Sequence, residues 1–173
     1  LDITAFDCDQ VGTQTVTLTA EDEYGNSSTC TALVTVEDNI APDVQCQPVT
    51  VQLDENGTGG ITPAAVDGGS SDACVLDNLS LNIAIFDCSN IGENAVLLTA
   101  TDVNGNSSSC TATVTVEDNV APEAICQNAT VQLAANGVGT LTAAQVDGGS
   151  TDACGLDGFS LSQASFGCGD IGI

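Results

Sequence analysis

An internal repeat constrains this chain more than any other feature of its sequence. The segment VEDNIAPDVQC at 36–46 recurs as VEDNVAPEAIC at 116–126, an offset of 80 residues. The same offset relates VDGGSSDAC at 66–74 to VDGGSTDAC at 146–154. A fixed period of this size predicts one structural unit that is used several times along the chain.

The shared motif DNxAP divides the chain into parts of repeats. If this motif is the junction, residues 41–120 form one complete repeat. Residues 1–40 are then the C-terminal half of the repeat before it, and residues 121–173 are the N-terminal part of the repeat after it. We therefore expect a parent protein that is longer on both sides.

The complete repeat shows the pattern of short β-strands and no helical pattern. In CTATVTVED at 110–118, threonine alternates with alanine and valine, as in a strand with one buried face. Asn-Gly pairs such as the one at 104–105 mark turns between the strands. Strands are predicted at 43–53, 60–66, 79–86, 94–101, 108–117 and 129–133. This pattern predicts an all-β fold of tandem immunoglobulin-like β-sandwich repeats, each of about 80 residues and stapled by disulfides.

The charge of the chain is entirely acidic, with 24 Asp and Glu and no Lys, Arg or His. Contacts to phosphate need Lys or Arg, so nucleic acid and anionic membrane surfaces are excluded as partners. No apolar run approaches the roughly 20 residues of a membrane span, so no membrane insertion is expected. The expected partners are other repeats of the same chain and identical chains in a filament, with any surface or glycan ligand left open.

Nine cysteines, with no CxxC motif and no histidine, indicate disulfides rather than zinc or redox sites. Disulfides form in oxidising compartments, so a secreted protein of the cell surface is predicted. The four cysteines of residues 41–120 allow three connectivities, and the sequence alone does not choose among them.

Strand positions favour one of these connectivities. Cys46 and Cys110 lie early in the first and last strands of the repeat, at the same end of the sandwich, which favours a bond between them. Cys74 and Cys88 then remain as the second pair, and they require a bend between them, because a straight strand would hold them too far apart. The next repeat continues this set of disulfide cysteines with Cys154 and Cys168.

Tracing the strand directions brings three acidic segments to one end of the sandwich: the linker at 37–39 and the loops at 67–78 and 102–107. Carboxylates crowded together without a basic residue repel one another, and a cation relieves that repulsion. Oxygen ligands suit Ca²⁺, which takes 6–8 of them, so a structural Ca²⁺ is expected at each junction. The alternative is that these residues only form turns, where Asp and Asn bond their own backbone.

The predicted metal ligands fall into two sets, one for each junction. At the first junction they are Glu37, Asp38, Asn39, Asp67, Asp72, Asp77, Asp102, Asn104 and Asn106. At the second they are Glu117, Asp118, Asn119, Asp147, Asp152 and Asp157.

No catalytic residue is predicted, and we do not expect an enzyme. Carboxylate pairs could suggest glycoside hydrolysis, but they recur with the repeat, and a catalytic site is rarely copied in tandem. The Ser and Cys side chains have no His or Lys to act as a base.

The stretch TATDVNGNSSSCTATVTVEDNVAPEAIC at 99–126, with the VDGGSxDAC loop, resembles hyalin-repeat (HYR-like) modules. It is most similar to the tandem repeats of very large Bacteroidota cell-surface proteins, including gliding adhesins of the SprB type. The resemblance covers the whole chain and implies an immunoglobulin-like sandwich, export, and a role in adhesion or surface filaments. The linker VEDNxAP is also similar to the cadherin junction, which implies Ca²⁺ ligands at 37–39 and 117–119.

Three functions follow from these features. The first is a stalk or filament segment of a secreted adhesin, rigidified by disulfides and by Ca²⁺. The second is a module that binds carbohydrate or another ligand, and the third is a spacer array in a secreted multidomain enzyme. Sugar binding uses exposed aromatic side chains, and this chain has only four Phe and one Tyr, which favours the stalk.

Overall fold

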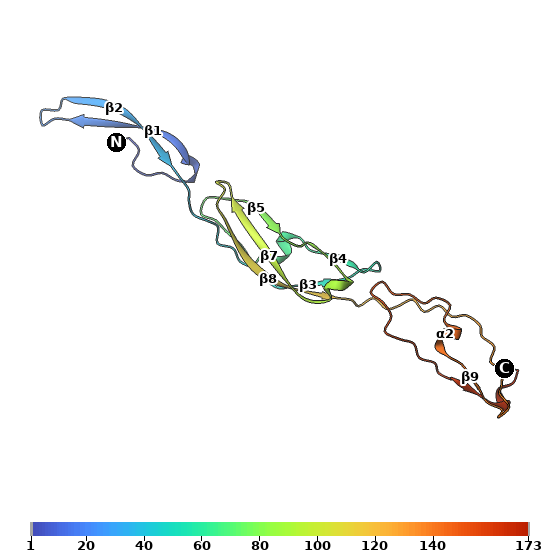
Figure 1. Cartoon of the computed structure of the whole chain (residues 1–173). Helices are drawn as coiled ribbons and strands as arrows, with labels where there is room; N and C mark the ends of the chain where they lie inside the picture. Colours follow the sequence, from blue (N-terminus) through green and yellow to red (C-terminus); the bar gives the residue numbers. More distant parts are fainter. Residues whose placement is uncertain (1, 173) are drawn as a thin grey trace. The chain divides into compact units, whose positions relative to one another are not determined.

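The computed structural model describes residues 2–172, and the fold is all-β, as the sequence predicts (Figure 1). The strands are β1 (Gly12–Glu21), β2 (Ser27–Val36), β3 (Val49–Gln52), β4 (Thr58–Gly60), β5 (Leu76–Leu81), β6 (Ile85–Asp87), β7 (Gly92–Asp102), β8 (Ser107–Glu117), β9 (Gly139–Thr140) and β10 (Ser165–Phe166). The helical elements are single turns: α1 (Pro63–Val66), α2 (Ala143–Val146), η1 (Cys8–Gln10), η2 (Cys88–Asn90) and η3 (Cys168–Asp170). None of the helices within residues 2–172 has the length and apolar character needed to cross a membrane.

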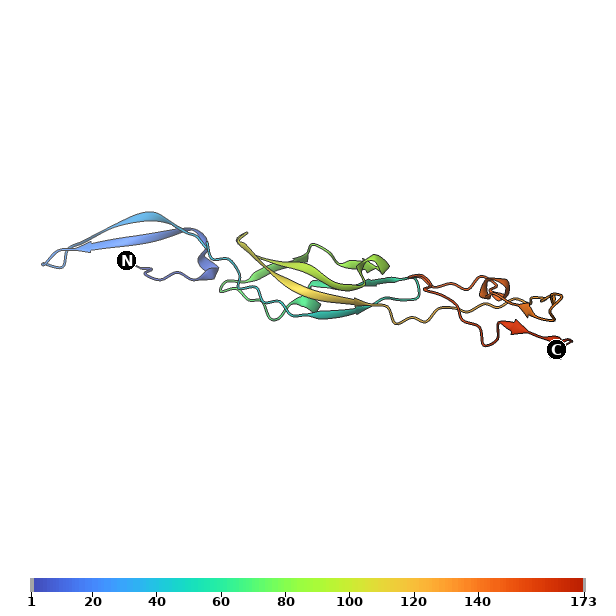
Figure 2. The ribbon, with the colours of Figure 1, turned by 60° about the horizontal axis from the view of Figure 1, so that its bottom comes forward.

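The strands form one four-stranded sheet and three pairs. The four-stranded sheet has the order β3-β8-β7-β5, and the pairs are β1–β2, β4–β6 and β9–β10. The β1–β2 pair is an antiparallel hairpin with an unbroken register from Gly12 opposite Val36 to Glu21 opposite Ser27. Figure 2 shows this hairpin as a two-stranded ribbon.

The chain divides into two compact units. The first holds the chain up to Val49, together with Ile61–Ala84 and Asn94–Val114. The second holds Thr50–Gly60, Ile85–Glu93 and the chain from Thr115 onward. Both units therefore take segments from the complete repeat and from an incomplete one.

The elements recur at the 80-residue offset of the sequence. β7 and β8 are the counterparts of β1 and β2, and α2 is the counterpart of α1. The isolated bridges recur as well: Asp43 pairs with Ser71 as Glu123 does with Thr151. Because the same local sequence gives the same local structure each time, the sequence period is also a structural period.

Three of the predicted strands differ in the structure. The region 43–53 is a strand only over β3 and otherwise carries single bridges, and 129–133 contains no strand. The region 60–66 holds α1 instead of a strand; Pro63 suits the first position of this turn, but its counterpart α2 forms with Ala143 there, so the proline is not required for it. The region 79–86 is divided between β5, which pairs with β7, and β6, which pairs with β4.

Most of the apolar core lies in the complete repeat, and Val16 on β1 is the buried apolar residue outside it among the described residues. The buried side chains of this repeat alternate with less buried ones along β7 and β8, and in β8 this follows the alternation of threonine with alanine and valine. The buried apolar residues of the complete repeat are Val51, Leu53, Val66, Phe86, Val96, Leu98, Ala100, Ala112, Val114 and Val116. Gly59 on β4 allows the close approach of β3, since a Cβ there would lie 2.6 Å from Cγ1 of Val51.

Two of the three disulfides join different sequence repeats. Cys8 bonds Cys74 and Cys88 bonds Cys154, each across a separation of 66 residues. The predicted Cys74–Cys88 pair is therefore wrong, and Cys168 is not the partner of Cys154. The reason is the division of 79–86 into two strands of different sheets, which form no hairpin to bring Cys74 and Cys88 together.

The third disulfide, Cys46–Cys110, confirms the prediction, with a Cα–Cα distance of 5.9 Å. Among the described residues, Cys30, Cys126 and Cys168 are free and exposed. Each of them is the counterpart of a bonded cysteine in the complete repeat: Cys110, Cys46 and Cys88, respectively.

Candidate metal site

The first acidic cluster forms where the linker after β2 meets two loops of the same unit. Carboxylate oxygens of Asp38 and Asp72 lie within 4.8 Å of each other and of the Cys74 Sγ atom. Asn104 Nδ2 donates a hydrogen bond of 2.9 Å to Asp38 Oδ2. Asn106 Nδ2 donates another, of 3.0 Å, to the Asp38 backbone oxygen. The linker and both loops therefore meet here, as the strand directions predicted.

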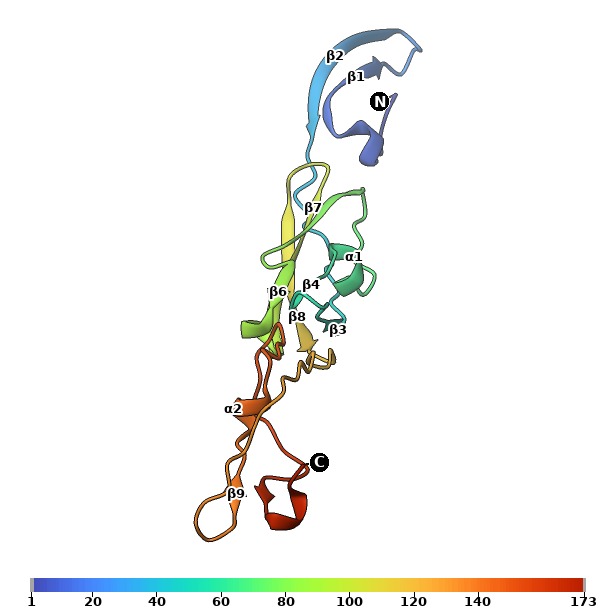
Figure 3. The ribbon, with the colours of Figure 1, turned by 90° about the vertical axis from the view of Figure 1, so that its right-hand side faces the viewer.

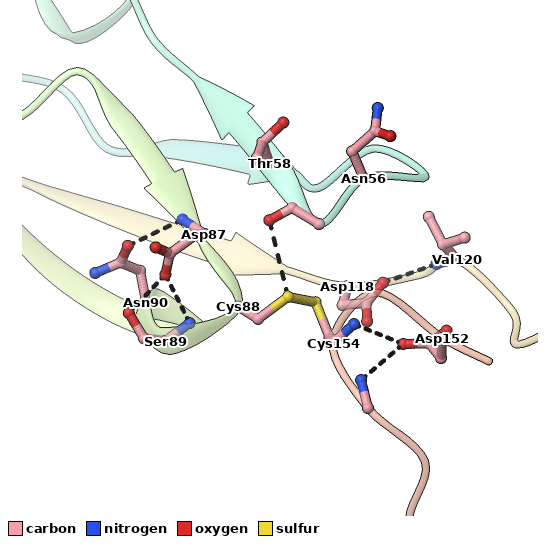
Figure 4. Close-up of a disulfide and its surroundings, with 12 residues drawn as sticks. Asn56, Thr58, Asp87, Cys88, Ser89, Asn90, Asp118, Val120, Asp152 and Cys154 are labelled. Carbon is pink, nitrogen blue, oxygen red and sulfur yellow. Dashed lines mark hydrogen bonds between the residues drawn. A yellow bond between two sulfur atoms is a disulfide. The ribbon is translucent and has the colours of Figure 1, made fainter.

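The second cluster repeats this arrangement at the next junction. Carboxylate oxygens of Asp118 and Asp152 lie within 4.8 Å of each other and of the Cys154 Sγ atom. Figure 4 shows the two carboxylates beside the Cys88–Cys154 disulfide. A shallow hollow next to them is lined by Asp118, Asp152, Asp157 and the ring of Phe159.

Each cluster offers oxygen ligands only. Cys74 and Cys154 are disulfide-bonded, and a metal-binding sulfur must be a thiolate. Two half-buried carboxylates remain at each junction. At the first junction the Asn104 and Asn106 amides turn Nδ2 toward Asp38 and act as hydrogen-bond donors. Carboxylate oxygens are ligands for hard cations, whereas Zn²⁺ prefers nitrogen and sulfur.

Asp67 and Asp147 do not face the clusters. Asp67 Oδ1 accepts hydrogen bonds from the Ser70 backbone N–H and hydroxyl, and Asp147 does the same with Ser150. These bonds hold the pKa of both carboxyls below the ordinary value, with the larger effect from the serine hydroxyl and the smaller from the backbone N–H. These two residues are therefore turn formers, as the alternative interpretation of the sequence held.

Asp102 occupies the base of the loop at 102–107, where it is 2% exposed. Burial raises its pKa, but the hydrogen bonds from the side chain and backbone of Asn106 and from the backbone of Asn104 outweigh it, so the pKa is lowered. Asn106 Nδ2 bonds both Asp102 Oδ2, at 2.8 Å, and the Asp38 backbone oxygen. Asp102 thus positions the amide that holds Asp38 and is not itself a member of the cluster.

The remaining predicted ligands have other partners. Glu117 Oε2 accepts a hydrogen bond of 2.7 Å from Gln52 Nε2, and Asn119 Nδ2 donates one of 2.6 Å to Gln52 Oε1. At the first junction Asn39 Nδ2 donates to Glu37 Oε2. Asp77 is exposed on β5. The structure therefore brings together Asp38 with Asp72 and Asp118 with Asp152, with Asp157 lining the hollow beside the second pair. The other acidic residues of the two sets lie outside the clusters.

Gln52 is a junction residue that the sequence analysis missed. It lies on β3 and forms hydrogen bonds with Glu117, the last residue of β8, and with Asn119 in the linker that follows. The signal that could have found it is the repeated VQL segment, which places Gln132 at the counterpart position. A polar side chain that recurs within an apolar strand indicates a specific hydrogen bond.

No protein-family model matches the chain. The arrangement itself supports a chemical role for the clusters: they can bind a hard cation between the linker and the loop that carries Cys74 or Cys154.

Proposed function

We propose that this chain is a structural segment of a secreted cell-surface stalk or filament, built of tandem immunoglobulin-like repeats. The observation that carries this proposal is the pair of disulfides between neighbouring sequence repeats, Cys8–Cys74 and Cys88–Cys154. A bond that links each repeat to the next, at the same separation each time, suits a structural array. The resemblance to HYR-like repeats of surface adhesins supports the same role.

The four-stranded sheet and the β4–β6 pair support the sandwich architecture of the repeat. Immunoglobulin-like domains pack two antiparallel sheets over an apolar core. The buried side chains of the complete repeat come from both sheets, with Phe86 on β6 and Val96, Leu98, Val114 and Val116 on β7 and β8.

Ca²⁺ at the junctions is the second part of the proposal. Asp38 and Asp72 come from different sequence repeats and approach each other although no basic residue is present to neutralise them. A bound Ca²⁺ would replace their repulsion with attraction. It would then hold the linker against the loop, with Asp118 and Asp152 in the same role at the next junction.

The stalk is a better match than a sugar-binding module. Carbohydrate binding relies on exposed aromatic rings, and the exposed large aromatics among residues 2–172 are Tyr24 and Phe159. They lie on separate compact units, so neither unit offers a stacking platform of two rings.

Peptide mapping without reduction tests the array. Trypsin finds no site, so the protein is cut with a protease specific for acidic residues. We expect linked peptides that contain Cys8 with Cys74 and Cys88 with Cys154. A peptide that links Cys74 to Cys88 would place the bonds inside the repeats and overturn the stalk proposal.

Calorimetric titration with Ca²⁺ separately tests whether an ion binds at each junction and holds the linker against the loop. We expect binding at both junctions, with Asp72→Asn removing binding at the first junction and Asp77→Asn, an exposed acid outside the cluster, leaving it unchanged. Small-angle scattering should also change on addition of EGTA. No heat and an unchanged scattering profile would refute the Ca²⁺ clamp and leave the disulfide-linked stalk standing.

A further inference from the structure

The disulfide between Cys8 and Cys74 has two carboxylates beside one of its sulfur atoms. An oxygen of Asp38 and an oxygen of Asp72 each lie within 4.8 Å of Cys74 Sγ. Asp72 and Cys74 belong to the loop that follows α1, whereas Asp38 belongs to the linker that follows β2 (Figure 3). Two separate segments of the chain therefore bring negative charge to the same sulfur.

Hydrogen bonds fix both carboxylates in this position. Asp72 Oδ1 accepts a bond of 2.8 Å from the backbone N–H of Cys74, so the local sequence Asp-Ala-Cys itself places the carboxylate next to the sulfur. Asp38 Oδ2 accepts a bond of 2.9 Å from Asn104 Nδ2, and its Oδ1 accepts one of 3.0 Å from the backbone N–H of Ile40. The charge beside Cys74 is therefore held there by the folded chain.

The disulfide between Cys88 and Cys154 repeats this arrangement (Figure 4). An oxygen of Asp118 and an oxygen of Asp152 each lie within 4.8 Å of Cys154 Sγ. Asp152 Oδ1 accepts a hydrogen bond of 2.8 Å from the backbone N–H of Cys154, as its counterpart does in the first disulfide. Because the chain contains no Lys, Arg or His, no basic side chain offsets the negative charge at either disulfide.

The third disulfide provides a comparison within the same chain. Among residues 2–172, neither Cys46 nor Cys110 belongs to a group with two acidic side chains at this distance. Both are half-buried, as Cys74 and Cys154 are, so burial does not separate the bonds. The net charge of −24 acts on all three disulfides. What distinguishes the two bonds between repeats is therefore the charge directly beside their sulfur atoms.

Negative charge beside a disulfide slows its reduction by thiols. An external thiolate forms a bond with one sulfur, and the other cysteine leaves as a thiolate that takes up a proton. A second external thiolate attacks the mixed disulfide, which releases the second cysteine and the oxidised form of the reductant. During each attack the negative charge spreads over the attacking, attacked and leaving sulfurs, so Cys74 or Cys154 carries part of it whichever sulfur is attacked first. Carboxylates nearby repel that charge and raise the barrier.

We propose that the paired carboxylates protect the two disulfides between repeats from anionic thiols such as glutathione. The bonds that join one repeat to the next then have a protection that Cys46–Cys110, inside the repeat, lacks. A thiol with a positive charge is attracted by the same carboxylates, so the charge of the reductant decides how fast it reduces these bonds. This inference rests on the disulfides and their neighbouring carboxylates, and it does not depend on bound Ca²⁺.

The test compares two reductants of opposite charge: glutathione, a net anion, and cysteamine, which carries an ammonium group. Free thiols are first blocked with N-ethylmaleimide, the buffer contains EGTA, and the initial rate of reduction of each bond is followed by alkylation and mass spectrometry. We expect the ratio of the glutathione rate to the cysteamine rate to be at least about tenfold lower at Cys8–Cys74 and Cys88–Cys154 than at Cys46–Cys110. High salt should remove most of this difference, because it screens the charges. Equal ratios at all three bonds would overturn the proposal.

Two variants, each the control for the other, locate the effect. Asp72→Asn should raise the glutathione rate at Cys8–Cys74 at least about threefold and leave the rate at Cys88–Cys154 unchanged. Asp152→Asn should do the reverse. Asparagine keeps the Oδ1 atom that accepts the cysteine N–H, so the turn is retained. Loss of charge raises the glutathione rate and not the cysteamine rate, whereas a loosened fold raises both. A variant that raises both rates equally would therefore refute the electrostatic protection.

Discussion

The alternating burial of β7 gives a sharp test of the core, because two adjacent leucines face opposite sides of the strand. Leu98 is 0% exposed and Leu97 is 39% exposed. Each loses the same three carbon atoms on substitution by alanine. At about 0.8 kcal/mol for each buried carbon group, Leu98→Ala loses about 2.4 kcal/mol of transfer free energy, and the cavity left behind raises the loss to about 3–4 kcal/mol.

Leu97→Ala should cost much less, about 1–1.5 kcal/mol, because part of its side chain already contacts water and no closed cavity forms. The hydrogen bonds that Leu97 makes with Asn82 use its backbone and survive the substitution. Urea unfolding followed by circular dichroism measures both free energies of unfolding. Equal losses for the two variants, or a larger loss for Leu97→Ala, would refute the register of β7 and the position of the core.

Two further predictions concern close packing and pH. Gly59→Ala should destabilise the protein by about 1–3 kcal/mol, because the new Cβ would clash with Val51 and with the Gln52 carbonyl. Gly158→Ala is the control in the same urea assay, because a Cβ there has no atom within 4 Å. An equal loss of stability in the two variants would contradict the packing of β4 on β3. Asp102 has a lowered pKa in the folded protein, so its contribution to stability is present at neutral pH and is lost as the pH falls through the folded pKa. Asp102→Asn should therefore be less stable than the parent at pH 7 and about equally stable near pH 2. In the control Asp77→Asn, which changes an exposed carboxylate, the difference from the parent should not depend on pH in this way. A difference for Asp102→Asn that stays constant with pH would count against the stabilising role of the Asp102 carboxylate.

The long hairpins were predictable from the sequence because their signal is local. Threonine alternates with alanine and valine in β8, and Gly105 supplies the left-handed backbone conformation that the turn between β7 and β8 requires. The Cys46–Cys110 bond followed from the position of each cysteine in its strand. These features need only a period of two and the direction of the chain.

The disulfides between repeats were not predictable by the same reasoning, since elimination within residues 41–120 assumes that every cysteine bonds inside its own repeat. The structure breaks that assumption: Cys74 and Cys88 both bond cysteines in neighbouring repeats. The offset of 66 residues shared by both bonds was present in the sequence, but it is not distinguishable from other cysteine spacings without coordinates.

The sequence analysis predicted where the acidic segments meet and included all four cluster aspartates, but it also assigned acidic residues that lie outside the clusters. The linker and the loops meet because of the direction in which each strand runs, and that direction was predictable from the order of the strands in the sequence. Asp67 and Asp147 accept hydrogen bonds from the serine three residues later. The four cluster aspartates also close turns, since each accepts a hydrogen bond from the backbone N–H two residues later, so turn formation does not separate the two groups. Sequence reasoning treated all these carboxylates alike because Asp is both a metal ligand and a turn former.

The overlap of the three disulfides has a mechanical consequence. The covalent rings 8–74, 46–110 and 88–154 overlap, so every peptide bond from Cys8 to Cys154 lies inside at least one ring. Cleavage at any single point in this span releases no fragment until the cystines are reduced. Under tension, the shortest covalent route crosses two cystines and only about 14 residues, which limits the stretch to about 50–60 Å, against about 500 Å for the reduced polypeptide. Pulling forces at a surface would therefore be borne by cystine and a short length of backbone even after every strand had unfolded.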